Sequence, residues 1–130
     1  TILLELPVTD VLITTEIRLF SATENSKIGI VLDYTGESFL LFCIINKNEL
    51  VLLKVFGGTE EVLESFKINP NQNNAYKIKI QCTDNQVNLF NNDSQIGSYK
   101  SPEKFSANVG FFSGKYVSAR ISNIFISGKK

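Results

Sequence analysis

The 130-residue sequence contains no histidine, no tryptophan and no methionine, and only two cysteines. Without histidine, Ser–His and Cys–His catalysis and histidine-ligated metal sites are excluded. The absence of tryptophan removes the strongest aromatic platform for stacking against a sugar ring. Cys43 and Cys82 lie in apolar segments, which predicts buried free thiols, with a disulfide between two layers as the alternative.

An excess of charge of either sign is also lacking, because 13 basic residues balance 13 acidic ones. A nucleic-acid partner is therefore not expected, since such proteins carry a basic patch or stripe. No apolar segment approaches the roughly 20 residues that cross a bilayer, so no membrane insertion is predicted. The sequence opens without Met and without a charged-then-apolar leader, from which we expect a domain excised from a longer protein.

Alternation of apolar and polar residues with a period of two is the main pattern that the sequence does contain. In 75–83, one face consists of Tyr76, Ile78, Ile80 and Cys82. Turn formers such as Gly57–Gly58 and Asn92–Asp93 separate the alternating segments. The predicted strands are 2–6, 11–21, 28–34, 38–46, 49–56, 60–66, 75–83, 86–91, 95–99, 108–113 and 117–127. This pattern predicts one all-β domain over 1–130, a two-layer antiparallel β-sandwich.

Residues 28–56 depart from clean alternation, because the strands at 38–46 and 49–56 are apolar on both faces. Both faces of these strands must therefore be covered. The cover is either the domain's own termini and loops or a neighbouring domain, a homodimer interface, or a ligand in a groove. In 117–127 the alternation slips near Asn123–Ile124, which predicts a β-bulge there.

The C-terminal half carries an ordered set of short motifs. They are YKIKI at 76–80, LFNND at 89–93, NVG at 108–110 and ARISNIFI at 119–126. This order resembles the concanavalin A-like lectin/glucanase superfamily, jelly rolls that include laminin-G-like modules and domains of the keto-disaccharide hydrolase type. Tyr76 stands where that family usually has Trp, and Asp93 where its turn has Gly. The resemblance implies a jelly-roll sandwich, and an extracellular or cell-surface location.

Aromatic and amide side chains near strand ends are the candidates for sugar binding, because a ring can stack on a pyranose while planar polar groups bind its hydroxyls. These candidates are Tyr34, Tyr99, Tyr116, Asn46, Asn48 and Asn91. The resemblance to laminin-G-like modules also implies calcium at the rim, for which Asp84 and Asp93 supply hard oxygen ligands. No other cofactor is predicted.

We expect a non-catalytic carbohydrate-binding or adhesion-type module of a larger protein. The E-x-D-x-x-E strand of jelly-roll glucanases has no match in the sequence. One alternative is a glycoside-processing domain of the keto-disaccharide hydrolase type, in which Asp33 and Glu37 supply the carboxylates. A second alternative is a structural module that contacts another protein through the apolar face of 28–56.

Overall fold

The computed structural model describes residues 2–5, 10–22, 28–45, 48–71, 75–102, 108–113 and 117–129. These residues form eleven strands: β1 (Ile2–Glu5), β2 (Asp10–Ala22), β3 (Ile28–Leu32), β4 (Ser38–Ile45), β5 (Glu49–Phe56), β6 (Thr59–Lys67), β7 (Ala75–Thr83), β8 (Gln86–Asn91), β9 (Ser94–Lys100), β10 (Asn108–Ser113) and β11 (Val117–Lys129). All eleven predicted strands are confirmed, with ends that differ by at most two residues. No helix able to span a membrane is found in the described part of the chain.

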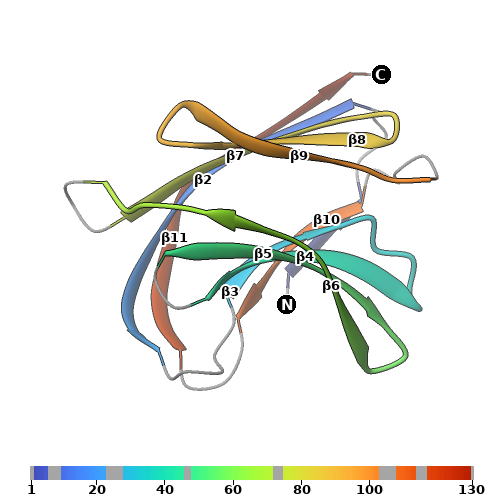
Figure 1. Ribbon diagram of the computed structural model, residues 1–130, viewed down its shortest axis with the longest axis horizontal. Helices are drawn as coiled ribbons and strands as arrows, with labels where there is room; N and C mark the ends of the chain where they lie inside the picture. The colour runs from blue at the N-terminus through green and yellow to red at the C-terminus, as the bar shows by residue number, and fades with distance from the viewer. Residues whose placement is uncertain are drawn as a thin grey trace.

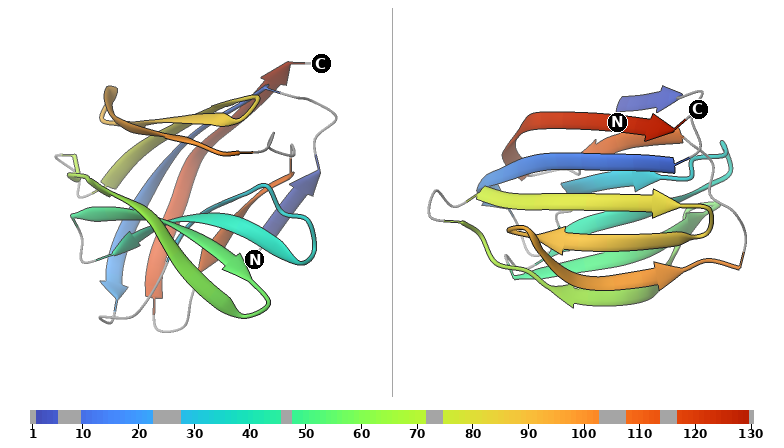
Figure 2. Two further views of the ribbon diagram at one scale, coloured as in Figure 1. Left: turned by 45° about the vertical axis from the view of Figure 1, so that its right-hand side comes forward. Right: turned by 90° about the horizontal axis from the view of Figure 1, so that it is seen from above.

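The strands pair into two antiparallel sheets that lie face to face (Figure 1). One sheet has six strands in the order β1-β10-β3-β4-β5-β6, and the other has five in the order β11-β2-β7-β8-β9. Figure 2 shows the same two layers from the side and from above. Strands β3 to β6 and β7 to β9 are neighbours in chain order, whereas β10 lies between β1 and β3 from a distant part of the sequence. This two-layer arrangement confirms the predicted all-β sandwich.

The main core lies between the two sheets, and the predicted alternation fills it. Tyr76, Ile78, Ile80 and Cys82 of β7 are all at most 3% exposed, whereas Lys77, Lys79 and Gln81 point the other way. Facing them are the inner residues of the six-stranded sheet, of which Phe42 and Leu52 are fully buried. Burying this apolar surface supplies the main stabilisation of the fold, at roughly 25 cal/mol per Å².

A second apolar cluster lies on the outer face of the six-stranded sheet. Its members are Val31, Leu41, Cys43, Val51 and Leu53, flanked by partly buried Tyr34, Phe39, Ile45, Val55 and Phe112. The prediction that β4 and β5 are apolar on both faces is thus confirmed. The five central side chains are at most 4% exposed in the isolated chain, so the chain itself keeps water from the middle of this face. Among the three alternatives, this supports cover by the domain's own chain.

The bulge predicted in the last strand is confirmed. The pairing of β11 with β2 runs from Ser122↔Glu16 to Phe125↔Thr14, so two residues of β11 lie opposite the single residue Thr15. Thr15 is fully buried, and its hydroxyl donates a hydrogen bond to the Ser122 carbonyl at 3.1 Å. Because of the bulge, Phe125 is 59% exposed while Ile126 packs against the core.

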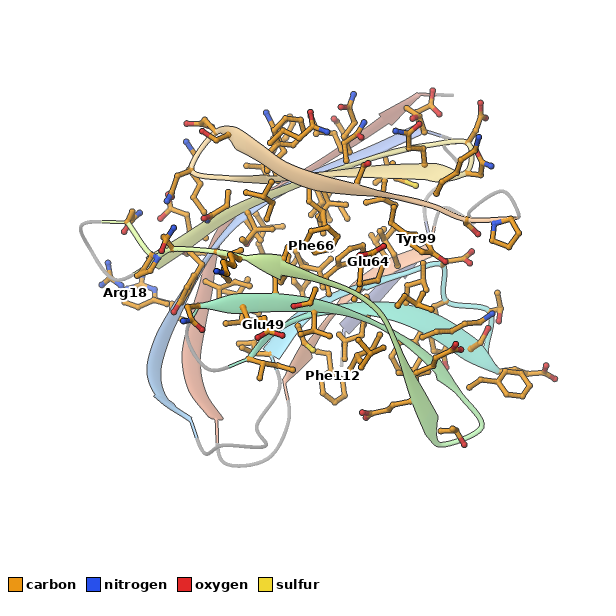
Figure 3. The ribbon with its side chains drawn as sticks, in the orientation of Figure 1. Arg18, Glu49, Glu64, Phe66, Tyr99 and Phe112 are labelled. Carbon is orange, nitrogen blue, oxygen red and sulfur yellow. The ribbon has the colours of Figure 1, made fainter. Side chains whose placement is uncertain are left out.

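The edges of the two sheets meet where β6 lies against β9. The Phe66 ring occupies the space above Gly97, where an added Cβ would lie 2.3 Å from a ring carbon. Figure 3 shows Phe66 between the two layers at this edge, near Glu64 and Tyr99. Residue 97 must therefore be small for the sandwich to close here.

Both cysteines are free and buried, as predicted, and they lie in different layers. Cys43 belongs to the outer cluster and its thiol donates to the Val51 carbonyl at 3.7 Å, whereas Cys82 belongs to the main core. Burial raises the pKa of the Cys82 thiol to about 12, and the charges of Asp33, Asp10 and Asp84 add to this effect.

These thiols should be unreactive in the folded protein. The thiolate is the reactive species, and at pH 8 almost none forms at Cys82, while burial shields both residues. With an aromatic disulfide reagent at pH 8, we expect no reaction in buffer and two thiols per chain in denaturant. Rapid reaction of one thiol in buffer would contradict the described packing.

Candidate functional site

The hairpin of β5 and β6 extends beyond the five-stranded layer and carries a hollow on the surface. Its two-residue turn, Gly57–Gly58, has φ angles of 55° and 81°, which fits a type I′ turn and confirms the predicted hairpin. Figure 1 shows this turn at the lower right, pointing away from the upper layer. The ends of β5 and β6 are therefore not covered by the second sheet.

Four side chains line a hollow of about 500 Å³ at this hairpin: Lys54, Phe56, Thr59 and Glu61. Lys54 is paired with Glu61, and Phe56 with Thr59, so all four lie on one face of the two strands. This face is continuous with the buried positions Leu50 and Leu52. The volume lies within the range of small-ligand sites.

Phe56 is the central group of this hollow, which we call the hairpin hollow. Its side chain is 58% exposed. Within the described part of the chain, neither Lys54 nor Glu61 has a hydrogen-bond or ion-pair partner. The hollow thus combines an apolar ring face with an available donor and an available acceptor, which is the chemistry that a sugar ring requires.

The predicted tyrosines do not gather in this hollow. The Tyr34 ring packs against Phe39 with centroids 5.9 Å apart, at the margin of the outer cluster. Tyr99 packs against the main core from β9, where Figure 3 shows it close to Glu64. Both are partly exposed, and their role in ligand binding stays a prediction. Tyr116 and Asn46 lie outside the described residues, and Asn48 is exposed in the turn before β5.

Asn91 has a structural role that the sequence did not reveal. Its side chain is only 6% exposed. The Oδ1 atom accepts from the Asn69 amide at 2.8 Å, and Nδ2 donates to the carbonyls of Asn69 at 3.2 Å and Lys77 at 3.3 Å. These bonds use most of the amide's capacity, so little remains for a ligand.

The two predicted calcium ligands lie at opposite ends of β8. Asp84 is in the turn before this strand and Asp93 in the turn after it, and β8 between them alone spans about 17 Å at 3.4 Å per residue. The Asp93 carboxylate pairs with Lys77 Nζ at 3.0 Å. Among the described residues, no three acidic, cysteine or histidine side chains are placed to hold a metal ion. The two aspartates therefore cannot bind one ion together, and calcium at either turn alone stays a prediction.

No protein-family model and no curated protein sequence matches the chain. Several solved structures are similar to the chain. The carbohydrate-binding module CBM66 from Bacillus subtilis is similar with a TM-score of 0.73 and 14% identity, over 92% of this chain and 76% of that one. The galectin LEC-6 of Caenorhabditis elegans is similar with a TM-score of 0.65 and 15% identity, over 97% of this chain and 89% of that one. Sheep galectin-11 is similar with a TM-score of 0.56 and 13% identity, over 93% of this chain and 96% of that one.

These similarities show the fold, a two-layer jelly-roll sandwich that the chain shares with these structures. At the level of the fold, they agree with the resemblance drawn from the sequence motifs. At such low identity, function does not follow from the likeness, and it must be argued from the site.

Proposed function

We propose that the protein is a non-catalytic carbohydrate-binding module and that the hairpin hollow is its sugar site. The observation that carries this proposal is the exposed Phe56 ring with Lys54 and Glu61 beside it. Structural neighbours that are carbohydrate-binding modules and lectins support it at the level of the fold. A secreted or cell-surface location fits this role.

The proposed binding mode follows from the chemistry of the four lining groups. The apolar face of a sugar ring stacks on Phe56, where it replaces water over the exposed ring. The Lys54 ammonium donates to sugar hydroxyls, and the Glu61 carboxylate and Thr59 hydroxyl accept from them. The type I′ turn holds the ends of β5 and β6 in fixed register, so little order is lost on binding.

Replacing Phe56 by Ala should weaken sugar binding about tenfold to a hundredfold. Burying a phenyl ring is worth about 1.5–3 kcal/mol, and about 1.4 kcal/mol corresponds to a factor of ten. The measurement is a calorimetric titration against a panel of neutral oligosaccharides, which first identifies the tightest ligand and then compares variants.

Val62→Ala is the matched control, because Val62 lies on the same hairpin and is 65% exposed, but does not line the hollow. It should bind the panel like the unchanged protein. If both variants bind equally well, the site lies elsewhere. If no oligosaccharide binds at millimolar concentration, the proposed function is wrong.

A further inference from the structure

The chain has only two arginines, against eleven lysines, and the fold places them opposite each other. Arg18 of β2 and Arg120 of β11 are direct partners in the antiparallel register. Their neighbours Ile17 and Ile121 face the core, so both arginines point away from it. The Cβ atoms of such directly opposed residues lie about 4.5–5.5 Å apart. We call this pair the arginine pair.

This arrangement is unfavourable for the folded chain by itself. Like charges directly opposite on neighbouring strands repel and destabilise the pairing. Neither guanidinium has an ion pair or hydrogen bond with another residue that the structure describes. Arg120 is exposed and Arg18 is half-buried, so both are open to an external partner.

Among the residues that the structure describes, the acidic side chains near the arginine pair do not neutralise it. Glu16 lies two positions before Arg18 on the same face, about 6.8 Å along the strand, and its own cross-strand partners are Ser122 and Lys77. The residue opposite Arg18 on the third strand is Ala75, which carries no charge. The carboxylate of Asp93 is held by Lys77.

We infer that the arginine pair binds a single oxyanion, a carboxylate or a sulfate, carried by a glycan. Guanidinium groups bind such oxyanions through two parallel hydrogen bonds, and two of them facing each other can bind one from both sides. The bound anion would also remove the repulsion between the arginines. A zero net charge and the lack of further arginines argue against nucleic acid or an anionic membrane, which need many basic contacts.

This inference rests on the proposed function for the nature of the ligand, but it concerns a different surface. Figure 3 shows Arg18 at the left side of the molecule, and the β5–β6 turn is at the lower right in the same orientation. A neutral sugar in the hairpin hollow and an anionic group at the arginine pair would therefore be recognised independently.

Nuclear magnetic resonance can follow the two arginine side chains separately, since the chain gives only two Nε–Hε signals. The probes are glucuronate for the carboxylate, glucose 6-sulfate for the sulfate, glucose for the neutral sugar, and inorganic sulfate for the free ion. Both arginine signals should shift and saturate with glucuronate or with glucose 6-sulfate, at least tenfold more tightly than with inorganic sulfate. Glucose should leave them unchanged.

The variant Arg18→Gln/Arg120→Gln tests the site, and Lys67→Gln/Lys100→Gln removes the same charge from exposed positions elsewhere. The arginine variant should lose affinity for the anionic sugar at least tenfold, with a melting temperature no lower than that of the unchanged protein. The lysine variant should lose less than twofold. Phe56→Ala should leave the arginine signals and their titration unchanged.

Several outcomes would overturn the inference. Equal losses in the two charge variants would show a general electrostatic effect. Equal affinity for inorganic sulfate and glucose 6-sulfate would show binding of an adventitious ion only. Shifts that appear only with an oligonucleotide or with anionic lipid vesicles would show another class of partner.

The proposed function is tested separately. If Phe56→Ala does not affect the binding of neutral sugars, the proposed hairpin site is refuted, and the results at the arginine pair are unaffected.

Discussion

Replacing Gly29 by Ala should lower the free energy of unfolding by about 3 kcal/mol or more. An added Cβ at this position would lie 1.8 Å from the Phe42 carbonyl oxygen and 2.8 Å from the Cys43 Cα. Both are backbone atoms, so no side-chain rotation can relieve the contact. Strands β3 and β4 would have to separate where Gly29 pairs with Cys43, in the middle of the six-stranded sheet. Overpacking of this kind ranks among the most destabilising single substitutions.

Urea denaturation measures this loss of stability, with Gly36→Ala as the control variant. Gly36 has a positive φ of 91° but no heavy atom within 4 Å of an added Cβ, so its substitution should cost only about 1–2 kcal/mol. A Gly29→Ala variant no less stable than Gly36→Ala would contradict the close approach of β3 and β4. If Gly29→Ala accumulates only as insoluble protein while Gly36→Ala folds, Gly29→Ala is the less stable variant, as expected.

The architecture was predictable from the sequence because the pattern that encodes it is local. Alternation as in 75–83, the apolar runs within 28–56 and the turn formers between segments were together sufficient to place every strand. The bulge at Asn123–Ile124 was also visible as a break in that alternation. The isolated Gly29 within an apolar strand was a signal of close backbone approach, although its partner strand was not evident.

The candidate site was less predictable, because it depends on where one sheet ends relative to the other. Alternation assigns Phe56 to the same face as Leu50 and Leu52, which are buried. Only the three-dimensional arrangement shows that the second sheet does not reach the end of β5, so that Phe56 is exposed. Its position directly before Gly57–Gly58 was the available signal. The pairing of Arg18 with Arg120 was not predictable either, because it depends on the register between two strands that are far apart in the sequence.

Asn91 is a residue of a type suited to ligand binding whose side chain bonds within the fold. Replacing it by Ala should lower the free energy of unfolding by about 2–3 kcal/mol. The substitution removes three hydrogen bonds and leaves the Asn69 amide without its acceptor in a partly buried position. An unsatisfied buried donor costs about 1–3 kcal/mol. The loop after Ile68 would lose its bonds to Asn91, while the Asn92 side chain would still donate to the Asn69 carbonyl at 3.2 Å.

Two further variants make the Asn91 test specific. Asn88→Ala, on the same strand but outside the core, removes only contacts with Gln86 and Gln95 near the surface and should change stability by less than about 0.5 kcal/mol. Asn91→Asp keeps the acceptor but places a carboxylate at a buried site without the two donated bonds. Relative to the unchanged protein at each pH, the Asp variant should be most destabilised at pH 7 and recover as the pH falls, because protonation restores a donor. If Asn91→Ala and Asn88→Ala unfold at the same urea concentration, the amide does not hold this loop, and its predicted role in ligand binding regains priority.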